Sequence, residues 1–334
     1  MADAPVLSVR NLTVDFKTDD GMVHAVHDVS FDVAAGETLG IVGESGSGKS
    51  VTSLAILGLL PDTAVVTGEV MFEGQNLVGR SDKELRPYRG DRIAMIFQDA
   101  LTALNPVQRV GDQIAEAIAV HHDVGKDELK KRSADLLDLV GIPQPAERAE
   151  NYPHEFSGGM RQRAMIAMAI ANDPDVLIAD EPTTALDVTI QAQVLDVLNR
   201  IQERTNTATM LITHDLGVVA GIADRVMVMY AGREAEVGTV DDIFYRPSHP
   251  YTRGLLTSMP RVDRRMDGAR LQGIEGQPPS SMFLPPGCAF HPRCPYADLG
   301  GLCTTVVPEL QVVLGDHTAA CHFATTLDER EKRA

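Results

Sequence analysis

Apolar and polar residues alternate along two N-terminal segments, residues 6–16 and 26–33, as they do in strands buried on one face. Continuous apolar runs follow at 38–42 and 92–97, and these predict strands buried on both faces. A helical stretch over 50–60 leaves the first of the two runs. The chain therefore begins as a mixture of strands and helix.

The period of the apolar positions changes between residues 107 and 171, where it becomes helical. Amphipathic spacing over 110–120 and 128–140 predicts two helices, and Ser157 can cap a third. Strand and helix alternate again from residue 176 to residue 230. This pattern predicts an α/β core that is interrupted by a helical insert.

The composition of the chain changes after residue 245. Pro, Gly and Arg become frequent there, and all four cysteines follow. We therefore expect a main domain over 1–245, a small irregular extension over 246–327, and a charged tail over 328–334. The composition of the tail predicts disorder.

The 334 residues have a formal net charge of −17 and a pI near 4.9, which argues against a surface that binds nucleic acid broadly. No apolar run reaches the length of a membrane span, and the first ten residues do not resemble a signal peptide. We expect a cytosolic protein whose membrane role, if it has one, comes through a partner.

Residues 43–50 read Gly-Glu-Ser-Gly-Ser-Gly-Lys-Ser, which fits the phosphate-binding P-loop pattern Gly-x4-Gly-Lys-Ser between a strand and a helix. The glycines let backbone N–H groups turn toward phosphate oxygens, and the N-terminus of the helix adds positive potential. Lys49 is expected to reach the β- and γ-phosphates, and Ser50 to bind Mg²⁺. The predicted nucleotide-binding residues of this segment are Gly43, Ser45, Gly46, Ser47, Gly48, Lys49, Ser50 and Val51.

A second acidic element ends the apolar strand over 176–179, where Asp180 and Glu181 follow directly. Ligands of open α/β sheets bind at the carboxyl ends of strands. We expect Asp180 to hold Mg²⁺ and Glu181 to polarise the attacking water. The sequence thus predicts ATP hydrolysis.

Residues 156–163 read Phe-Ser-Gly-Gly-Met-Arg-Gln-Arg, and the Ser-Gly-Gly step can bind an anion at a helix N-terminus. Its place between the P-loop and the acidic strand resembles the signature motif of ABC ATPases. In that family two ATPase domains meet head to tail, and each signature completes the nucleotide site of the other. The resemblance implies that role for Ser157, Gly158, Gly159 and Met160, where Met160 replaces the usual Gln.

Further positions are similar to motifs of the same family. Gln98 matches the Q-loop, which touches Mg²⁺ or water, and Ala185-Leu186-Asp187 matches the D-loop of the dimer interface. His214 matches the switch histidine that contacts the γ-phosphate. Phe16 matches the aromatic residue on which adenine stacks, although a strand Phe can also simply pack in a core.

The C-terminal region narrows the resemblance to ATPases of dipeptide and oligopeptide importers, a subgroup shared with nickel importers. The similar segments are 247–256, 287–288, 292–295 and 320–322. The resemblance implies a peptide translocase ATPase, peripheral on the cytoplasmic face of the membrane. The expected partners are a second ABC ATPase subunit (a copy or a paralogue), two transmembrane permease subunits that dock near residues 99–106 and the helical insert, and, indirectly, an extracytoplasmic substrate-binding protein.

Two alternatives to peptide import stay open. The transported solute can be nickel or another small molecule, because the substrate is selected by other subunits. A soluble ABC-type ATPase acting on DNA or ribosomes is a rival class, but such proteins often have coiled-coil insertions or two tandem ATPase domains, and neither pattern is present.

The four cysteines, Cys288, Cys294, Cys303 and Cys321, have the spacing Cys-x5-Cys-x8-Cys-x17-Cys. In a reducing compartment this favours a metal site over disulfides. A [4Fe–4S] cluster tolerates irregular gaps, whereas structural Zn²⁺ sites usually contain a tight Cys-x2–4-Cys pair. We expect the cluster; Zn²⁺ bound with nearby histidines and unmetallated buried thiols are the alternatives.

Overall fold

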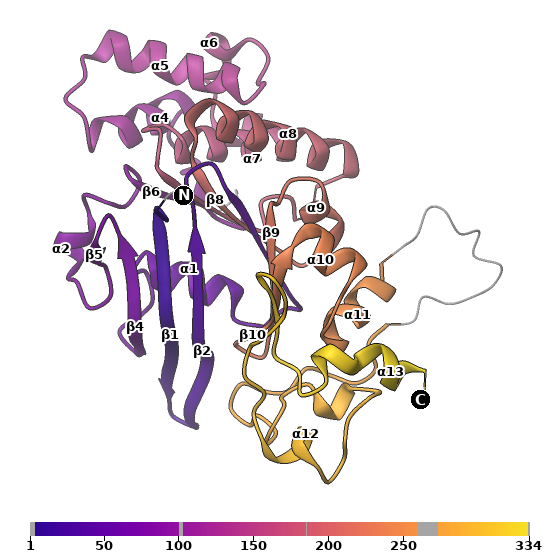
Figure 1. Cartoon of the computed structure of the whole chain (residues 1–334). Helices are drawn as coiled ribbons and strands as arrows, with labels where there is room; N and C mark the ends of the chain where they lie inside the picture. Colours follow the sequence, from indigo (N-terminus) through magenta and orange to yellow (C-terminus); the bar gives the residue numbers. More distant parts are fainter. Residues whose placement is uncertain (1–3, 100–102, 185, 260–272, 333–334) are drawn as a thin grey trace. The chain divides into compact units, whose positions relative to one another are not determined.

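The computed structural model describes residues 4–99, 103–184, 186–259 and 273–332 (Figure 1). The chain forms two compact units. Unit 1 consists of Met1–Ser8, Asp32–Thr38 and Met71–Ile212, and unit 2 consists of Val9–Phe31, Leu39–Val70 and Thr213–Ala334.

The N-terminal alternating segments are strands, as the pattern predicted. They are β1 (Leu7–Thr18) and β2 (Gly21–Val33), which share a sheet with β4 (Ala64–Phe72) and β5 (Gln75–Asn76) in the order β2-β1-β4-β5. In β1 the fully buried apolar positions shift from odd to even numbers after Asn11, which has a φ of +49°.

Unit 1 contains three parallel strands in the order β8-β7-β6, namely Ala208–Thr213, Val176–Asp180 and Ile93–Ile96. Every residue of β7 and β8 is buried, which explains their continuous apolar runs. The predicted insert contains α4 (Val110–Ala119), α5 (Lys126–Leu139), α6 (Pro145–Arg148), η1 (Pro153–Glu155) and α7 (Gly158–Ala169). The remaining helices are α2 (Asp82–Leu85) and α8 (Val188–Thr205).

Unit 2 contains a sheet region with the strand order β11-β12-β10-β9-β3. These strands are Gln311–Leu314, His317–Ala319, Arg233–Thr239, Arg225–Tyr230 and Thr38–Val42. Only β3 and β9 pair in parallel, and the other neighbours are antiparallel. The sequence predicted an irregular extension, but β11 and β12 extend this sheet from its β10 side.

Unit 2 also contains eight described helical segments, some of them short 3₁₀ turns. They are α1 (Lys49–Ile56), α9 (Leu216–Ala220), α10 (Val240–Tyr245), α11 (Pro250–Thr257), η2 (His291–Arg293), α12 (Leu302–Thr305), η3 (Ala324–Thr326) and α13 (Leu327–Glu331). No helix in the described part of either unit is long and apolar enough to cross a membrane.

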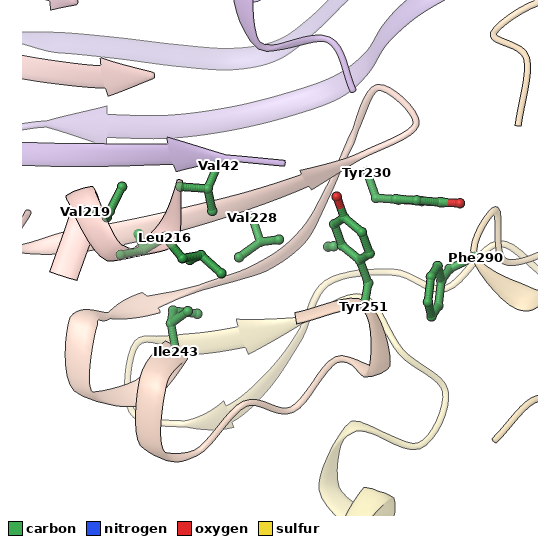
Figure 2. Close-up of a cluster of buried hydrophobic side chains, with 10 residues drawn as sticks. Val42, Leu216, Val219, Val228, Tyr230, Ile243, Tyr251 and Phe290 are labelled. Atoms are coloured by element: carbon green, nitrogen blue, oxygen red, sulfur yellow. The ribbon is translucent and has the colours of Figure 1, made fainter. Parts of the chain in front are cut away.

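The core of unit 2 joins the strands to the C-terminal region (Figure 2). Tyr251 of α11 is fully buried, and its ring lies 4.6 Å from that of Tyr230 and 5.4 Å from that of Phe290, measured between centroids. Phe290 belongs to the extension, whereas Tyr230 ends β9. The aromatic contacts therefore attach the extension to the strand that pairs with β3.

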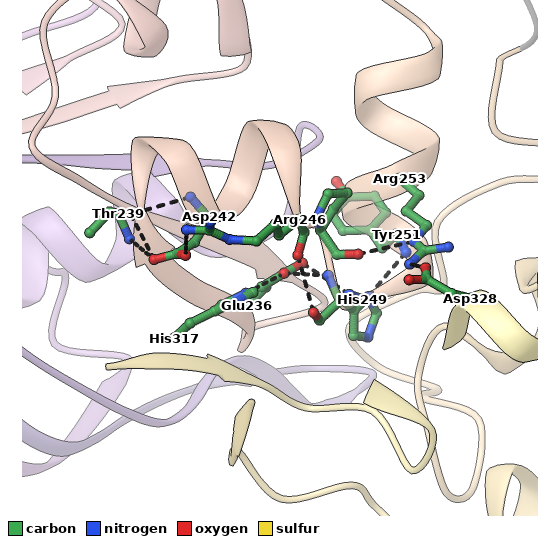
Figure 3. Close-up of polar contacts among 11 residues, drawn as sticks. Glu236, Thr239, Asp242, Arg246, His249, Tyr251, Arg253, His317 and Asp328 are labelled. Atoms are coloured by element: carbon green, nitrogen blue, oxygen red, sulfur yellow. Dashed lines mark hydrogen bonds and ion pairs between the residues drawn. The ribbon is translucent and has the colours of Figure 1, made fainter. Parts of the chain in front are cut away.

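The expectation of a disordered tail is wrong for residues 328–331, because they are part of α13. Leu327 is buried at the start of this helix. Arg253 of α11 forms an ion pair with Asp328 (Figure 3) and a second one with Glu331. Composition predicted disorder because it takes no account of these distant partners.

Candidate nucleotide-binding site

The P-loop lies in unit 2 between β3, in which every residue is buried, and α1, which begins at Lys49. Two of its glycines are required by close backbone approaches. A Cβ on Gly43 would lie 2.3 Å from the Met229 carbonyl oxygen. Gly48 has a φ of +102°, and a Cβ there would lie 2.7 Å from the Ala25 carbonyl oxygen. Neither position therefore has room for a side chain.

Lys49 is 5% exposed, and its ammonium group lies against the loop itself. Its Nζ donates to the carbonyl oxygens of Gly43, at 2.8 Å, and Glu44, at 3.0 Å. The positive charge is therefore held at the P-loop, where the phosphates of a nucleotide are expected. Ser50 follows Lys49 in the first turn of α1.

Two residues of the C-terminal region contact Glu44, the second residue of the P-loop. The Glu44 N–H donates to Tyr251 Oη at 2.8 Å, and Arg293 donates two hydrogen bonds to the Glu44 carboxylate. Sequence reasoning assigned no role to these three residues. The only signal was that Tyr251 and Arg293 lie within the segments that resemble peptide importers.

The acidic element lies in unit 1 at the carboxyl end of β7, where Asp180 is 5% exposed. Glu181 has a φ of +48°, an uncommon conformation for a non-glycine residue that is found preferentially at functional sites. Its Oε2 accepts hydrogen bonds from Gln98 Nε2 at 3.1 Å and Thr184 Oγ1 at 2.7 Å. The structure thus brings together Gln98 and Glu181, and it adds Thr184, for which the sequence contained no signal.

The predicted signature segment starts α7 of unit 1. Ser157 is the N-cap, and its Oγ accepts the Met160 N–H at 3.3 Å. Ser157 and Gly158 are exposed, whereas Gly159 is buried, and a Cβ on Gly159 would lie 2.7 Å from Ile190 Cγ2 of α8. Gly159 therefore permits the close approach of α7 and α8, a reason that the sequence did not reveal.

The remaining candidates occupy the ends of other elements. Asp187 caps α8, where its Oδ1 accepts the N–H groups of Thr189 and Ile190 at 3.0 Å each; Ala185 of the same expected D-loop lies outside the described residues. His214 is exposed directly after β8, and Phe16 is half-buried on β1.

The candidate residues therefore form two sets, each within its own unit. Unit 1 contains Gln98, Ser157, Gly158, Gly159, Met160, Asp180, Glu181 and Asp187. Unit 2 contains Phe16, the P-loop residues and His214. Of the expected docking segment, residues 100–102 lie outside the described ranges.

The four cysteines line one small cavity of about 20 Å³ in unit 2, and all are free thiols. Burial raises the pKa of Cys294 to about 12 and that of Cys321 to about 11, so these thiols are neutral at pH 7 when no metal is bound. Within the described residues, no group of three or more His, Cys, Asp or Glu side chains is arranged to hold a metal ion.

Comparisons with known proteins agree with these features. The family model described as "ABC transporter" matches residues 26–184, and the one described as "Oligopeptide/dipeptide transporter, C-terminal region" matches residues 235–300. Over 331 residues the chain is 55% identical to the dipeptide transport ATP-binding protein DppD of Bacillus subtilis (strain 168), covering 98% of this chain and 97% of that protein.

The chain is also 52% identical over 296 residues to the oligopeptide transport ATP-binding protein OppD of Escherichia coli (strain K12), covering 89% of this chain and 87% of that protein. A solved dimeric structure, described as a post-hydrolysis state of the ATP-binding cassette MJ0796 bound to ADP and Pi, is 27% identical with a TM-score of 0.64. That similarity covers 70% of this chain and 98% of the solved one. The chain has the α/β P-loop fold of an ABC ATPase cassette and belongs to the ATP-binding proteins of dipeptide and oligopeptide ABC transporters.

Proposed function

We propose that this chain hydrolyses ATP and powers the import of dipeptides or oligopeptides. The observation that supports hydrolysis most directly is the pairing of Gln98 with Glu181 at the carboxyl end of β7. The relatives named above, which are dipeptide and oligopeptide transport proteins, support the substrate class.

In the proposed reaction the P-loop N–H groups and Lys49 bind the phosphates of ATP, and Phe16 stacks on adenine. Ser50, Gln98 and Asp180 would hold Mg²⁺, which neutralises charge on the phosphates when bound. The donor set suits this ion, because hydroxyl, amide and carboxylate oxygens are its usual ligands.

Glu181 accepts hydrogen bonds from Gln98 and Thr184, so its carboxylate is held in one orientation for polarising the attacking water. His214 would contact the γ-phosphate. These roles follow the family resemblance, residue by residue.

We further propose that two ATPase subunits pair, so that Ser157, Gly158, Gly159 and Met160 of one contact the nucleotide of the other, with Asp187 at the interface. The exposure of Ser157 and Gly158 at the start of α7 agrees with a partner of this kind. Two permease subunits and a substrate-binding protein would complete the importer and place this chain peripherally on the cytoplasmic face of the membrane. We assign residues 1–245 to the ATPase domain and residues 246–327 to the importer-specific extension.

The variant Glu181→Gln tests the hydrolytic role. We expect ATP binding to persist and turnover to fall by about 100-fold or more, because Gln cannot act as a general base. Binding is measured by calorimetry with Mg²⁺-ATP, and turnover by phosphate release. Glu203→Gln, at an exposed position of α8, is the matched control and should hydrolyse ATP normally. Turnover near the wild-type rate in the Glu181 variant would exclude the assigned role.

For the cysteine cavity we propose a [4Fe–4S] cluster. The four thiols line one cavity, and four thiolates are the usual ligand set of such a cluster. When bound, the cluster would crosslink four positions of the extension.

The cluster is tested on anaerobically purified protein. We expect about four irons and four sulfides per chain, and loss of both in Cys303→Ser together with a lower melting temperature. Zinc in place of iron would support the alternative metal. Unchanged metal content and melting in the variant would mean that the thiols are packing residues only.

A further inference from the structure

Glu44 of the P-loop is held by an ion pair with the C-terminal extension. Arg293 Nη1 lies 2.6 Å from Glu44 Oε2, and Arg293 Nη2 lies 2.9 Å from Glu44 Oε1. This is the two-pronged geometry that matches a guanidinium to a carboxylate. The side chain of Arg293 is 4% exposed and that of Glu44 is 28% exposed, so water screens the pair only weakly.

The guanidinium is itself fixed by other parts of unit 2. Arg293 Nε donates to the Glu275 carbonyl oxygen at 3.0 Å. The guanidinium carbon lies 5.8 Å from the ring centroid of Tyr230 and 5.9 Å from that of Phe290. The Glu44 carboxylate also raises the pKa of Arg293, so the pair stays charged. Arg293 is therefore a rigid anchor.

The backbone of Glu44 is held as firmly as its side chain. Its N–H donates to Tyr251 Oη at 2.8 Å, and Tyr251 is fully buried. Its carbonyl oxygen accepts from Lys49 Nζ at 3.0 Å and from the Ser47 N–H at 3.2 Å. A continuous chain of contacts thus runs from Arg293 through Glu44 to the phosphate-binding lysine.

We propose that Arg293 and Tyr251 are positioning residues of the ATP site, which set the conformation of the P-loop through Glu44 without touching the nucleotide. The inference rests on the proposed role of the P-loop in binding ATP. A loop already held in its binding conformation loses less conformational entropy when the ligand arrives, so its affinity is higher. Loss of the anchor should therefore weaken ATP binding.

The test is a double-mutant cycle on the full chain, with Mg²⁺-ATP affinity measured by calorimetry and folding followed by circular dichroism. We expect Arg293→Gln and Glu44→Gln each to raise the Kd by about tenfold. The Kd of the double variant should lie within about twofold of the Kd of either single variant. Non-additivity of this kind shows that the two residues act through each other, which a general loss of stability would not produce.

Arg253→Gln is the matched control. Arg253 also lies in the C-terminal region and pairs with two carboxylates, but these belong to α13 and not to the P-loop. We expect its Kd for ATP to equal that of the wild type, even if its melting temperature falls. Equal weakening of ATP binding in the Arg253 and Arg293 variants would overturn the proposal.

If Arg293→Gln does not fold, Tyr251→Phe serves in its place, because it removes only the hydroxyl that accepts the Glu44 N–H. The positioning role is refuted if the folded Arg293 variant has a Kd within about twofold of the wild-type value. The same criterion applies to Tyr251→Phe when that variant is used instead. A wild-type chain that binds no ATP would instead refute the proposed function, so the two failures are distinguishable.

Discussion

Glu234 is a carboxyl group buried inside unit 2, where it is 6% exposed and accepts the Ser30 N–H. Burial raises its pKa from the ordinary 4.5 to about 7, and the negative charge of Asp28 adds to this shift. Between these two pH values the folded chain binds more protons at this residue than the unfolded chain does. Its contribution to the free energy of unfolding must therefore decrease as the pH rises from 4.5 through 7.

Glu234→Gln should remove this pH dependence, because Gln remains neutral and can still accept the Ser30 N–H. We expect the free energy of unfolding of the variant, relative to that of the wild type, to increase by about 3 kcal/mol from pH 4.5 to pH 8. The measurement is chemical denaturation of both proteins at the two pH values. If the two proteins differ in free energy of unfolding by the same amount at both pH values, Glu234 is ionised in the folded chain throughout this range.

The site residues that the sequence predicts most directly are those whose proposed function depends on neighbours in the chain. Lys49 and the glycines of the P-loop act within a few residues of one another, so a short pattern describes them. Arg293 and Glu44 are separated by 249 positions and meet only in the folded chain. A single sequence does not show which residues far apart in the chain become neighbours in the fold. The ion pair was therefore not predicted.

At the scale of elements, one buried carboxylate joins β10 to both β12 and the start of α11. Glu236 is fully buried and accepts a hydrogen bond from His317 Nε2 of β12 at 2.8 Å (Figure 3). It accepts another from the Ser248 N–H at 2.6 Å. It also accepts the N–H of His249, the N-cap of α11, at 3.0 Å. Three separate segments thus meet at Glu236.

Replacing Glu236 by Ala should destabilise these segments together, because it leaves buried donors without partners. We expect a loss of about 3–5 kcal/mol in the free energy of unfolding. Limited proteolysis should then cut near β11 and β12 first. Exposed Glu309→Ala is the control, and equal sensitivity of both variants would argue against a special role for Glu236.

Elements were predictable where they bury a face or are buried entirely, as in β1, β7 and β8. The strands β11 and β12 were missed because they are short, and three of the four residues of β11 are exposed. Their strand structure comes from pairing with β10, not from their own pattern.

At the scale of the whole molecule, the ATPase domain and the extension share a core and a sheet within unit 2, although the sequence suggested a boundary at residue 245. Phe290 packs against Tyr230 and Tyr251, and β12 pairs with β10. A chain shortened to residues 1–245 should therefore lose part of the support of its own P-loop, as well as its C-terminal region.

The pairing of β12 with β10 has a consequence for solubility. Strand edges present unpaired N–H and C=O groups that can pair with another chain. In the chain shortened to residues 1–245, β10 would expose the edge on which Glu236 pairs with Ala319 and Val237 pairs with Thr318 of β12. We expect this shortened chain to self-associate, visible as higher-mass species in light scattering, whereas the full chain remains of defined size. In the full chain, β12 covers this edge of β10 and so removes a site at which a second chain could add a strand.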